Sequence, residues 1–356
     1  MRKMTSRPFL PYWVAILVVL TSIASLASSA CHAAENTMIP EKGLGGWLGP
    51  NGKIPPPNLS GKVVLFDFWD YTCINCIRTF PHLNLLYEKY KDKGLIIVGI
   101  HSPEFSFAAQ PSRVQHAIEQ FGLAFPVVMD RNQILWDRFH NHYWPADYLY
   151  DKDGHLVYHA FGEGGYGRLE QKIRATLHLD QSQPPLKPAG EFPDGLTPEL
   201  YAGYQRGQLG NRSGYHPGTS FLYSKDHLSE DRITLEGQWR SYSDHLASGK
   251  IILAHPPVMT VLYHGTGVNA VLKRSSWKKE QSDDPVLIRV DGKPVPNKIA
   301  GKDIRFRSSG EKKQSIVPVH RARMYSLVSG QPFGSHRIDL LFLRKGTEVY
   351  TLTFNP

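Results

Sequence analysis

The sequence has little cysteine, and this scarcity excludes several classes of protein. Only 3 of its 356 residues are cysteine, too few for a small domain held together by disulfides. A structural zinc site needs a second pair of ligands beside Cys73 and Cys76. No second cysteine pair exists, and the nearest candidate histidines, His140 and His142, flank Asn141 in front of an aromatic segment. We therefore expect no metal site.

Long apolar runs are also missing, except near the N-terminus. Residues 12–20 are continuously apolar, follow the basic residues Arg2, Lys3 and Arg7, and precede the small residues 27–30. This is the three-part layout of a secretory signal, although the stretch also approaches the length of a short membrane-spanning helix. We expect residues 1–34 to be a signal peptide or an N-terminal membrane anchor, and the protein to function in the periplasm or cell envelope.

Cys31 follows this small-residue stretch directly. A bacterial lipid-attachment motif has an aliphatic residue three places before the cysteine, where this sequence has Ser28. A lipid anchor at Cys31 is therefore an off-pattern alternative, and the other interpretation is that Cys31 is removed with the leader. Export places the remaining cysteines in an oxidising or redox-managed compartment.

The formal net charge of +9 is unevenly distributed along the chain. Residues 1–34 carry +3, residues 35–195 carry −3 and residues 196–356 carry +9. The change of sign near residue 195 supports a domain boundary there. A nucleic-acid partner is disfavoured, because the protein is expected to be exported and contains no recognition motif.

Residues 35–180 alternate between strand and helix patterns. A buried strand over 62–69 precedes a helix that begins at the cysteines, and further strands are expected at 95–100 and 125–129, with helices at 114–121, 133–139 and 169–177. The segments 146–150 and 156–161 flank an Asp-Lys-Asp-Gly turn and predict a β-hairpin. This order indicates an α/β domain whose sheet contains mixed strand directions.

Cys73-Ile74-Asn75-Cys76 carries the chemistry of this domain. A cysteine between a strand and a helix lies at the helix N-terminus, where free N–H groups and the helix dipole favour a thiolate. Cys76 lies one turn later on the same face, so the two sulfurs can form a disulfide. An accessible attacking cysteine and a buried resolving cysteine suffice for thiol–disulfide exchange without a cofactor.

Two other uses of a cysteine motif fit less well. Covalent c-type haem attachment requires histidine after the second cysteine, and this sequence has Ile77. Thr72 directly precedes Cys73 without a proline upstream in that stretch, which differs from the motif of a peroxidase.

The residues around the cysteines resemble the thioredoxin family, in which Asp-Phe-Trp leads into Trp-Cys-x-x-Cys. Asp67 stands six residues before Cys73, and the resemblance implies that it exchanges a proton with the resolving thiol, a role suited to a buried carboxylate. The alternative role for Asp67 is that of a hydrogen-bonded strand residue. Trp69 matches the tryptophan that packs beside the disulfide and is expected to contribute to substrate binding.

Trp144-Pro145 matches the thioredoxin cis-proline, which implies a groove where an extended substrate pairs beside Cys73. An additional helix within residues 101–130 resembles the TlpA-like and AhpC/TSA-like periplasmic thioredoxins. Residues 143–150 and 161–166 are similar to the exported thioredoxin part of DipZ-type proteins. Ile74-Asn75 matches neither common thioredoxin dipeptide, so the reduction potential is not implied by the family.

A proline-rich linker over residues 181–195 separates this domain from residues 196–356. About eight short apolar runs, 235–242, 250–253, 258–263, 270–272, 286–290, 322–327, 337–343 and 348–354, predict a β-sandwich of the jelly-roll type. This part is similar to the DipZ C-terminal domain, which resembles carbohydrate-binding modules. Six aromatic residues are candidates for stacking on sugars: Tyr201, Tyr204, Tyr215, Tyr223, Trp239 and Trp277.

The sequence therefore predicts an exported thiol–disulfide oxidoreductase that acts on protein thiols and disulfides. The electron-conducting membrane domain of DipZ is missing, so a separate membrane redox partner would exchange electrons with the cysteine pair. The alternative is a glycan- or protein-binding envelope protein whose thioredoxin part is mainly a scaffold.

Overall fold

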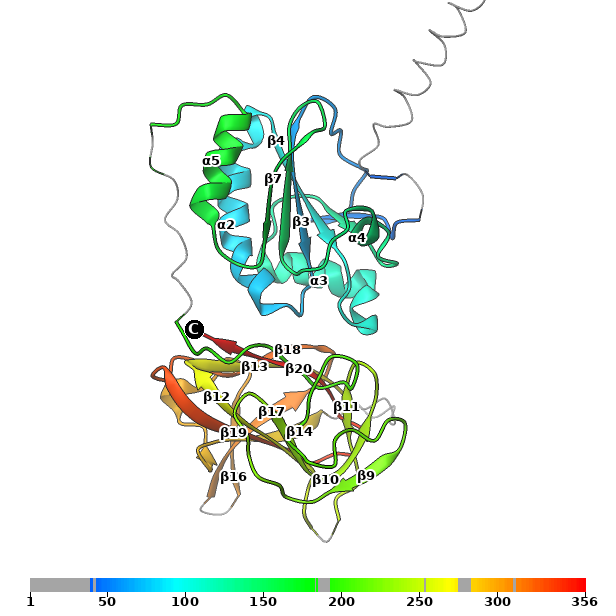
Figure 1. Ribbon diagram of the computed structural model, residues 1–356, viewed down its shortest axis with the longest axis vertical. Helices are drawn as coiled ribbons and strands as arrows, with labels where there is room; N and C mark the ends of the chain where they lie inside the picture. Colours follow the sequence, from blue (N-terminus) through cyan, green and yellow to red (C-terminus); the bar gives the residue numbers. More distant parts are fainter. Residues whose placement is uncertain are drawn as a thin grey trace, which may run out of the picture.

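The computed structural model describes residues 39–40, 43–182, 184, 193–252, 254–274, 283–309 and 312–356. We call the described residues from 43 to 182 the α/β half and those from 193 to 356 the β half. The two halves face each other, with the C-terminus on the side of the β half nearest the α/β half (Figure 1). The expected leader, Cys31, Trp277 and most of the expected linker lie outside the described residues. Within the described part of the chain, no helix has the length and apolar character needed to cross a membrane.

The α/β half contains a seven-stranded sheet in the order β2-β1-β5-β4-β3-β6-β7. β3, β4 and β5 are parallel, and β6 runs antiparallel to both β3 and β7. The prediction of mixed strand directions is thus confirmed. The strands are β1 Trp47–Gly49, β2 Gly52–Lys53, β3 Val63–Trp69, β4 Leu95–His101, β5 Val127–Met129, β6 Ala146–Tyr150 and β7 Leu156–Phe161.

Helices cover both faces of this sheet. One face is covered by α2 Ile74–Tyr90, α3 Pro111–Phe121 and α5 Tyr166–Thr176, and the other by α4 Ile134–Arg138. Short 3₁₀ turns, η1 Lys91–Lys93 and η2 Ser106–Ala109, follow α2 and β4. Every residue of β3 is buried, as expected for a central strand that is covered on both faces. The loop after β3 leads directly to the cysteines.

The β half is a sandwich of antiparallel strands, as predicted. One layer has the order β16-β17-β14-β19-β12-β10 and the other β10-β11-β20-β13-β18. β10 belongs to both layers because it bends at Gly237, whose φ of 84° favours glycine. Side chains of both layers form one buried core.

The strands of the β half are β8 Leu200–Tyr201, β9 Ser220–Tyr223, β10 Ile233–Ser241, β11 Leu246–Ser248, β12 Val258–Gly265, β13 Gly267–Lys273, β14 Asp284–Val290, β15 Lys293–Pro294, β16 Arg305–Ser309, β17 Lys312–Val319, β18 Arg323–Val328, β19 Gly334–Phe342 and β20 Glu348–Asn355, with a 3₁₀ turn η3 Asn297–Ile299. The strand predicted over 250–253 is wrong, because its described residues form only an isolated bridge between Ile252 and His255.

Candidate active site

The two cysteines lie at the start of α2 and are joined by a disulfide. Cys73 is the N-cap of the helix and has extended backbone angles, while its sulfur accepts a hydrogen bond from the Cys76 N–H at 3.2 Å. Cys73 is 9% exposed and Cys76 is 0% exposed. The sulfur at the helix N-terminus is therefore the more accessible of the two, and a thiolate there is favoured by the helix dipole.

Asp70 fixes the loop that joins β3 to Cys73. Its Oδ1 accepts hydrogen bonds from the backbone N–H and the hydroxyl of Thr72, both at 2.6 Å, and its Oδ2 accepts one from the Glu104 N–H at 3.0 Å. Burial raises the pKa of Asp70, and these hydrogen bonds oppose the rise. This role of Asp70 was not predicted from the sequence, although an aspartate two residues before a threonine is a common turn signal.

Asp67 lies in the middle of β3, on the face that α2 covers. Its strand neighbours on that face, Leu65 and Trp69, belong to the same buried cluster as Cys76. Neither carboxylate oxygen of Asp67 has a hydrogen-bond partner among the described residues. Burial, and then the charge of Asp147, raises the pKa of Asp67 well above its ordinary value.

Asp147 is the second carboxyl at this position, and it was not predicted from the sequence as a site residue. β3 and β6 pair with Asp67 directly opposite Asp147, so the two side chains point to one face with their Cβ atoms about 5 Å apart. Part of Asp147 is exposed, but its Oδ1 is inaccessible and has no partner among the described residues. Burial raises the pKa of Asp147 to about 7. Like charges at this spacing oppose simultaneous ionisation of the pair.

Trp69 is completely buried, which corrects the expectation that it contacts a substrate. Its ring packs edge-on against Phe80 and His101, with centroid distances of 5.1 and 4.9 Å, and it is 0% exposed. Trp69 is therefore a packing residue next to the cysteine-bearing helix.

Trp144 and Pro145 lie in the loop before β6, and the peptide bond between them is cis, as expected from the resemblance. The indole N–H of Trp144 donates to the Ser102 carbonyl at 3.0 Å, and its ring lies 4.1 Å from that of Trp136. The Pro145 carbonyl accepts the Gly162 N–H at 2.8 Å. Trp144 is partly exposed, so it remains a candidate wall of a substrate groove.

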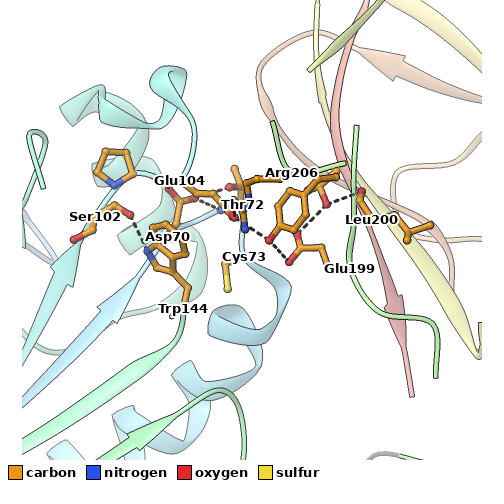
Figure 2. A network of polar contacts seen from close by, with 12 residues as sticks. Asp70, Thr72, Cys73, Ser102, Glu104, Trp144, Glu199, Leu200 and Arg206 are labelled. Carbon is orange, nitrogen blue, oxygen red and sulfur yellow. Dashed lines mark hydrogen bonds and ion pairs between the residues drawn. The ribbon is translucent and has the colours of Figure 1, made fainter. Parts of the chain in front are cut away.

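The β half contacts the loop beside the active site through Glu104 (Figure 2). Glu104 Oε1 accepts hydrogen bonds from Arg206 at 2.7 Å and from the Tyr201 hydroxyl at 3.1 Å, and the same hydroxyl lies 2.8 Å from Glu199 Oε2. Burial, and then the charge of Glu104, raises the pKa of Glu199 to about 7. Since Asp70 binds the Glu104 N–H, one chain of hydrogen bonds links the β half to the loop before Cys73.

Apolar contacts accompany this polar link. The ring of Tyr350, from β20, lies 5.0 Å from Phe105 and 4.8 Å from Phe107. Tyr350, Val271 and Ala322 of the β half belong to the same buried cluster as both cysteines. The active site therefore lies at the interface between the two halves.

The aromatic residues proposed to stack on sugars have different environments. Trp239 and Tyr223 are in the core of the sandwich, Tyr201 is in the interface and Tyr204 is 41% exposed. Burial excludes Trp239 and Tyr223 from contact with a glycan. Among the described residues, one group of potential metal ligands, Asp151, Asp153 and His155, lies in the exposed turn between β6 and β7, remote in the fold from the cysteine-bearing end of α2.

Sequence comparisons match each half of the chain to a known family. Residues 50–159 match the AhpC/TSA family and residues 197–355 match a family described as a thioredoxin-like C-terminal domain. The protein DipZ of Mycobacterium tuberculosis is 32% identical over 279 residues, covering 74% of this chain and 39% of DipZ. The chain thus spans only about two fifths of the length of that relative.

Two further proteins match a smaller part of the chain. The thiol-disulfide oxidoreductase YkuV of Bacillus subtilis is 31% identical over 132 residues, covering 37% of this chain and 87% of YkuV. A solved structure of a thioredoxin-like protein in its oxidised form is 30% identical, with a TM-score of 0.36, and covers 40% of this chain and 94% of that one.

Proposed function

The chain belongs to the thioredoxin-like thiol–disulfide oxidoreductases, and we propose that it exchanges disulfides with protein clients in the bacterial cell envelope. The observation that carries this proposal is the Cys73–Cys76 disulfide at the start of α2, with the more exposed sulfur at the helix N-terminus. That the clients are proteins is inferred from the family, and the envelope location is inferred from the expected leader. We also propose the division into a redox domain, residues 35–180, and a β domain, residues 196–356.

The exchange proceeds in two steps, formation and resolution of a mixed disulfide. In the reduced protein, the Cys73 thiolate attacks one sulfur of a client disulfide, forms a mixed disulfide and releases the other client sulfur as a thiolate. The Cys76 thiolate then attacks the Cys73 sulfur, closes the Cys73–Cys76 disulfide and releases the second client thiolate. Two electrons pass to the client, and two protons neutralise its thiolates. The reverse sequence oxidises a client dithiol by the same chemistry.

Asp67 acts as the proton acceptor for Cys76 in this proposal. The Cys76 thiol must lose its proton before it attacks, and a buried carboxylate with a raised pKa is suited to receive it at neutral pH. Asp147, directly opposite Asp67, is the positioning residue that opposes ionisation of Asp67. Trp144 forms the wall of a groove in which an extended client lies beside Cys73, and the buried Pro145 sets the backbone at Trp144 through the cis peptide bond.

Trapping the mixed disulfide tests this function. Full-length protein with Cys31→Ser, to remove the third thiol, is reduced and mixed with insulin, alone or with Cys73→Ser or Cys76→Ser added. We expect Cys76→Ser to accumulate an insulin adduct through Cys73, because its resolving thiol is missing. Cys73→Ser is expected to form no adduct and to reduce insulin only at the background rate. Equal insulin reduction by Cys73→Ser and its parent would exclude the proposed role.

The direction of exchange follows from the reduction potential of the pair. A shift of 30 mV corresponds to about 1.4 kcal/mol for this two-electron couple, so equilibration with glutathione distinguishes a reductase from an oxidase. Electrons would be exchanged with a separate membrane redox partner, and the cysteine pair needs no other cofactor. The alternative function in glycan binding now rests mainly on the exposed Tyr204 and the partly buried Tyr215.

A further inference from the structure

A cavity of about 580 Å³ lies between the two halves, next to the cysteines. Ile74 and Ile77, which follow Cys73 and Cys76 in the chain, form part of its wall, and α3 forms another part. The β half completes the wall with residues before and within β18 and with the end of β20. The volume lies within the range of known ligand sites, so the cavity can take several side chains of an extended polypeptide.

The wall of this cavity is cationic. Six basic side chains line it, and no aspartate or glutamate side chain does: Arg78, Arg113, His116, Lys302, Arg321 and Arg323. Arg78 pairs with Glu163 and Arg323 with Asp303, both at 2.7 Å. Pro356, the last residue of the sequence, also lines the cavity, and even a carboxylate there would leave the wall positive.

Three of the cations have no ion-pair partner among the described residues: Arg113, Lys302 and Arg321. Arg113 is partly buried, and its inaccessible Nη1 makes no hydrogen bond with a described residue. An unsatisfied guanidinium N–H is unfavourable when removed from water. A carboxylate is its best partner, because the planar guanidinium matches it in a bidentate geometry.

The wall also contains apolar side chains between these charges, including Phe121, Ala322 and Met324. A free inorganic anion would leave this surface unused, whereas a polypeptide with acidic and apolar side chains would contact both kinds of wall. Because Tyr71 and Ile74, on either side of Cys73 in the chain, line the cavity, a client whose cysteine lies at Cys73 can extend into it without a break in its chain.

We propose that this cavity binds an acidic segment of the client polypeptide, next to the client cysteine that reacts with Cys73. The proposal rests on the proposed disulfide exchange and names the class of client that the protein prefers. Attraction between the cationic wall and client carboxylates would select clients more through charge than through a specific sequence.

Fluorescence anisotropy with unreactive peptides tests the proposal without using catalysis. Three labelled peptides of equal length carry a central serine in place of cysteine and are flanked by leucine with glutamate, glutamine or lysine. We expect the oxidised full-length protein to bind the glutamate peptide at least about tenfold more tightly than the lysine peptide. This preference should decline as salt is raised toward 1 M, where the Debye length is about 3 Å.

Reversing the charge of basic residues in the cavity wall tests whether the glutamate peptide binds there. Lys302→Glu with Arg321→Glu changes two exposed residues of the cavity, and Lys250→Glu with Arg307→Glu makes the same charge change at exposed residues outside it. We expect the first pair to weaken binding of the glutamate peptide at least about tenfold and the second pair less than about twofold. Equal effects of the two pairs, or equal affinity for the glutamate and lysine peptides, would overturn the proposal.

Two further measurements separate this inference from other outcomes. Binding of polygalacturonate at the cavity, with no binding of the glutamate peptide, would overturn the peptide assignment in favour of an anionic glycan. Insulin reduction by wild type and Cys73→Ser reports on the proposed function alone. Active protein without a peptide preference therefore refutes only the cavity proposal, and inactive protein refutes the proposed function.

Discussion

Replacing Asp147 by asparagine should stabilise the α/β half at alkaline pH. Asp147 faces Asp67 across β3 and β6, in a site where burial raises its pKa from 3.8 to about 7. Each pKa unit corresponds to about 1.4 kcal/mol, so ionised Asp147 costs up to about 4 kcal/mol of folding free energy at pH 8, less where water reaches its exposed part.

The pH dependence follows from the raised pKa. Between about pH 4 and pH 7 the folded protein retains a proton that the unfolded chain releases, so stability falls as pH rises through this window. Below pH 4 both states hold the proton and the carboxyl has no such effect. Asp147→Asn removes the titration, so its advantage over wild type should be near zero at pH 4 and largest at pH 8.

Chemical denaturation at pH 4, 6 and 8, monitored by tryptophan fluorescence, measures this difference. Asp92→Asn, at an exposed position after α2, is the matched control and should show no such increase. The variant should also lower the pKa of Asp67, because the charge of Asp147 contributes to raising it. The pH midpoint for resolution of the mixed disulfide should then move to lower pH. A stability difference that is the same at pH 4 and pH 8 would refute the reasoning.

Three further predictions concern the loop and the interface beside the cysteines. Glu199→Gln should remove a loss of interface stability that wild type shows as pH rises from about 4.5 to about 7, because the raised pKa of Glu199 means that it keeps its proton in this range while the two halves are in contact. Hydrogen-exchange protection of residues 104–109 between pH 4.5 and 8 measures this. Tyr201→Phe removes the hydroxyl between Glu104 and Glu199 and should lower the same protection at pH 6, where unchanged exchange would contradict it. Asp70→Asn should lower the free energy of unfolding by about 1–3 kcal/mol, because an amide has one acceptor oxygen and cannot accept from both Thr72 and the Glu104 N–H. Chemical denaturation measures this, and a loss below about 0.5 kcal/mol would contradict it.

The sequence predicted the strand, cysteine pair and helix because each has a strong local signal. β3 is a continuous apolar run, as buried parallel strands are, and the hairpin of β6 and β7 has the predicted bounds on both sides of its turn. These features depend on residues close together in the chain. The thioredoxin resemblance added the cis peptide bond at Trp144-Pro145, which no local pattern specifies.

Features that depend on strand register or on distant segments could not be predicted in the same way. Asp147 lies opposite Asp67 only because β6 runs antiparallel to β3 in one particular register. Strand β16, with the sequence Arg-Phe-Arg-Ser-Ser, has no apolar run and pairs at the edge of its layer, where charged residues are common. The burial of Trp69 follows from packing by α2 and β4, and the sequence pattern alone did not distinguish it from a groove residue.

The charge distribution along the chain acquires a physical meaning from the interface between the halves. The basic excess of residues 196–356 includes Lys302, Arg321 and Arg323, which line the cavity together with Arg113 of the mildly acidic α/β half. The partly buried acids of the interface, Glu104 and Glu199, are not among the residues that line this cavity. Glu104 joins the halves through hydrogen bonds from Tyr201 and Arg206, Glu199 bonds to Tyr201 within the β half, and neither acid neutralises the cavity wall. An exposed basic surface would attract any anion. Basic residues beside the barely exposed Cys73 instead favour carboxylates of a client whose cysteine can reach the Cys73 sulfur.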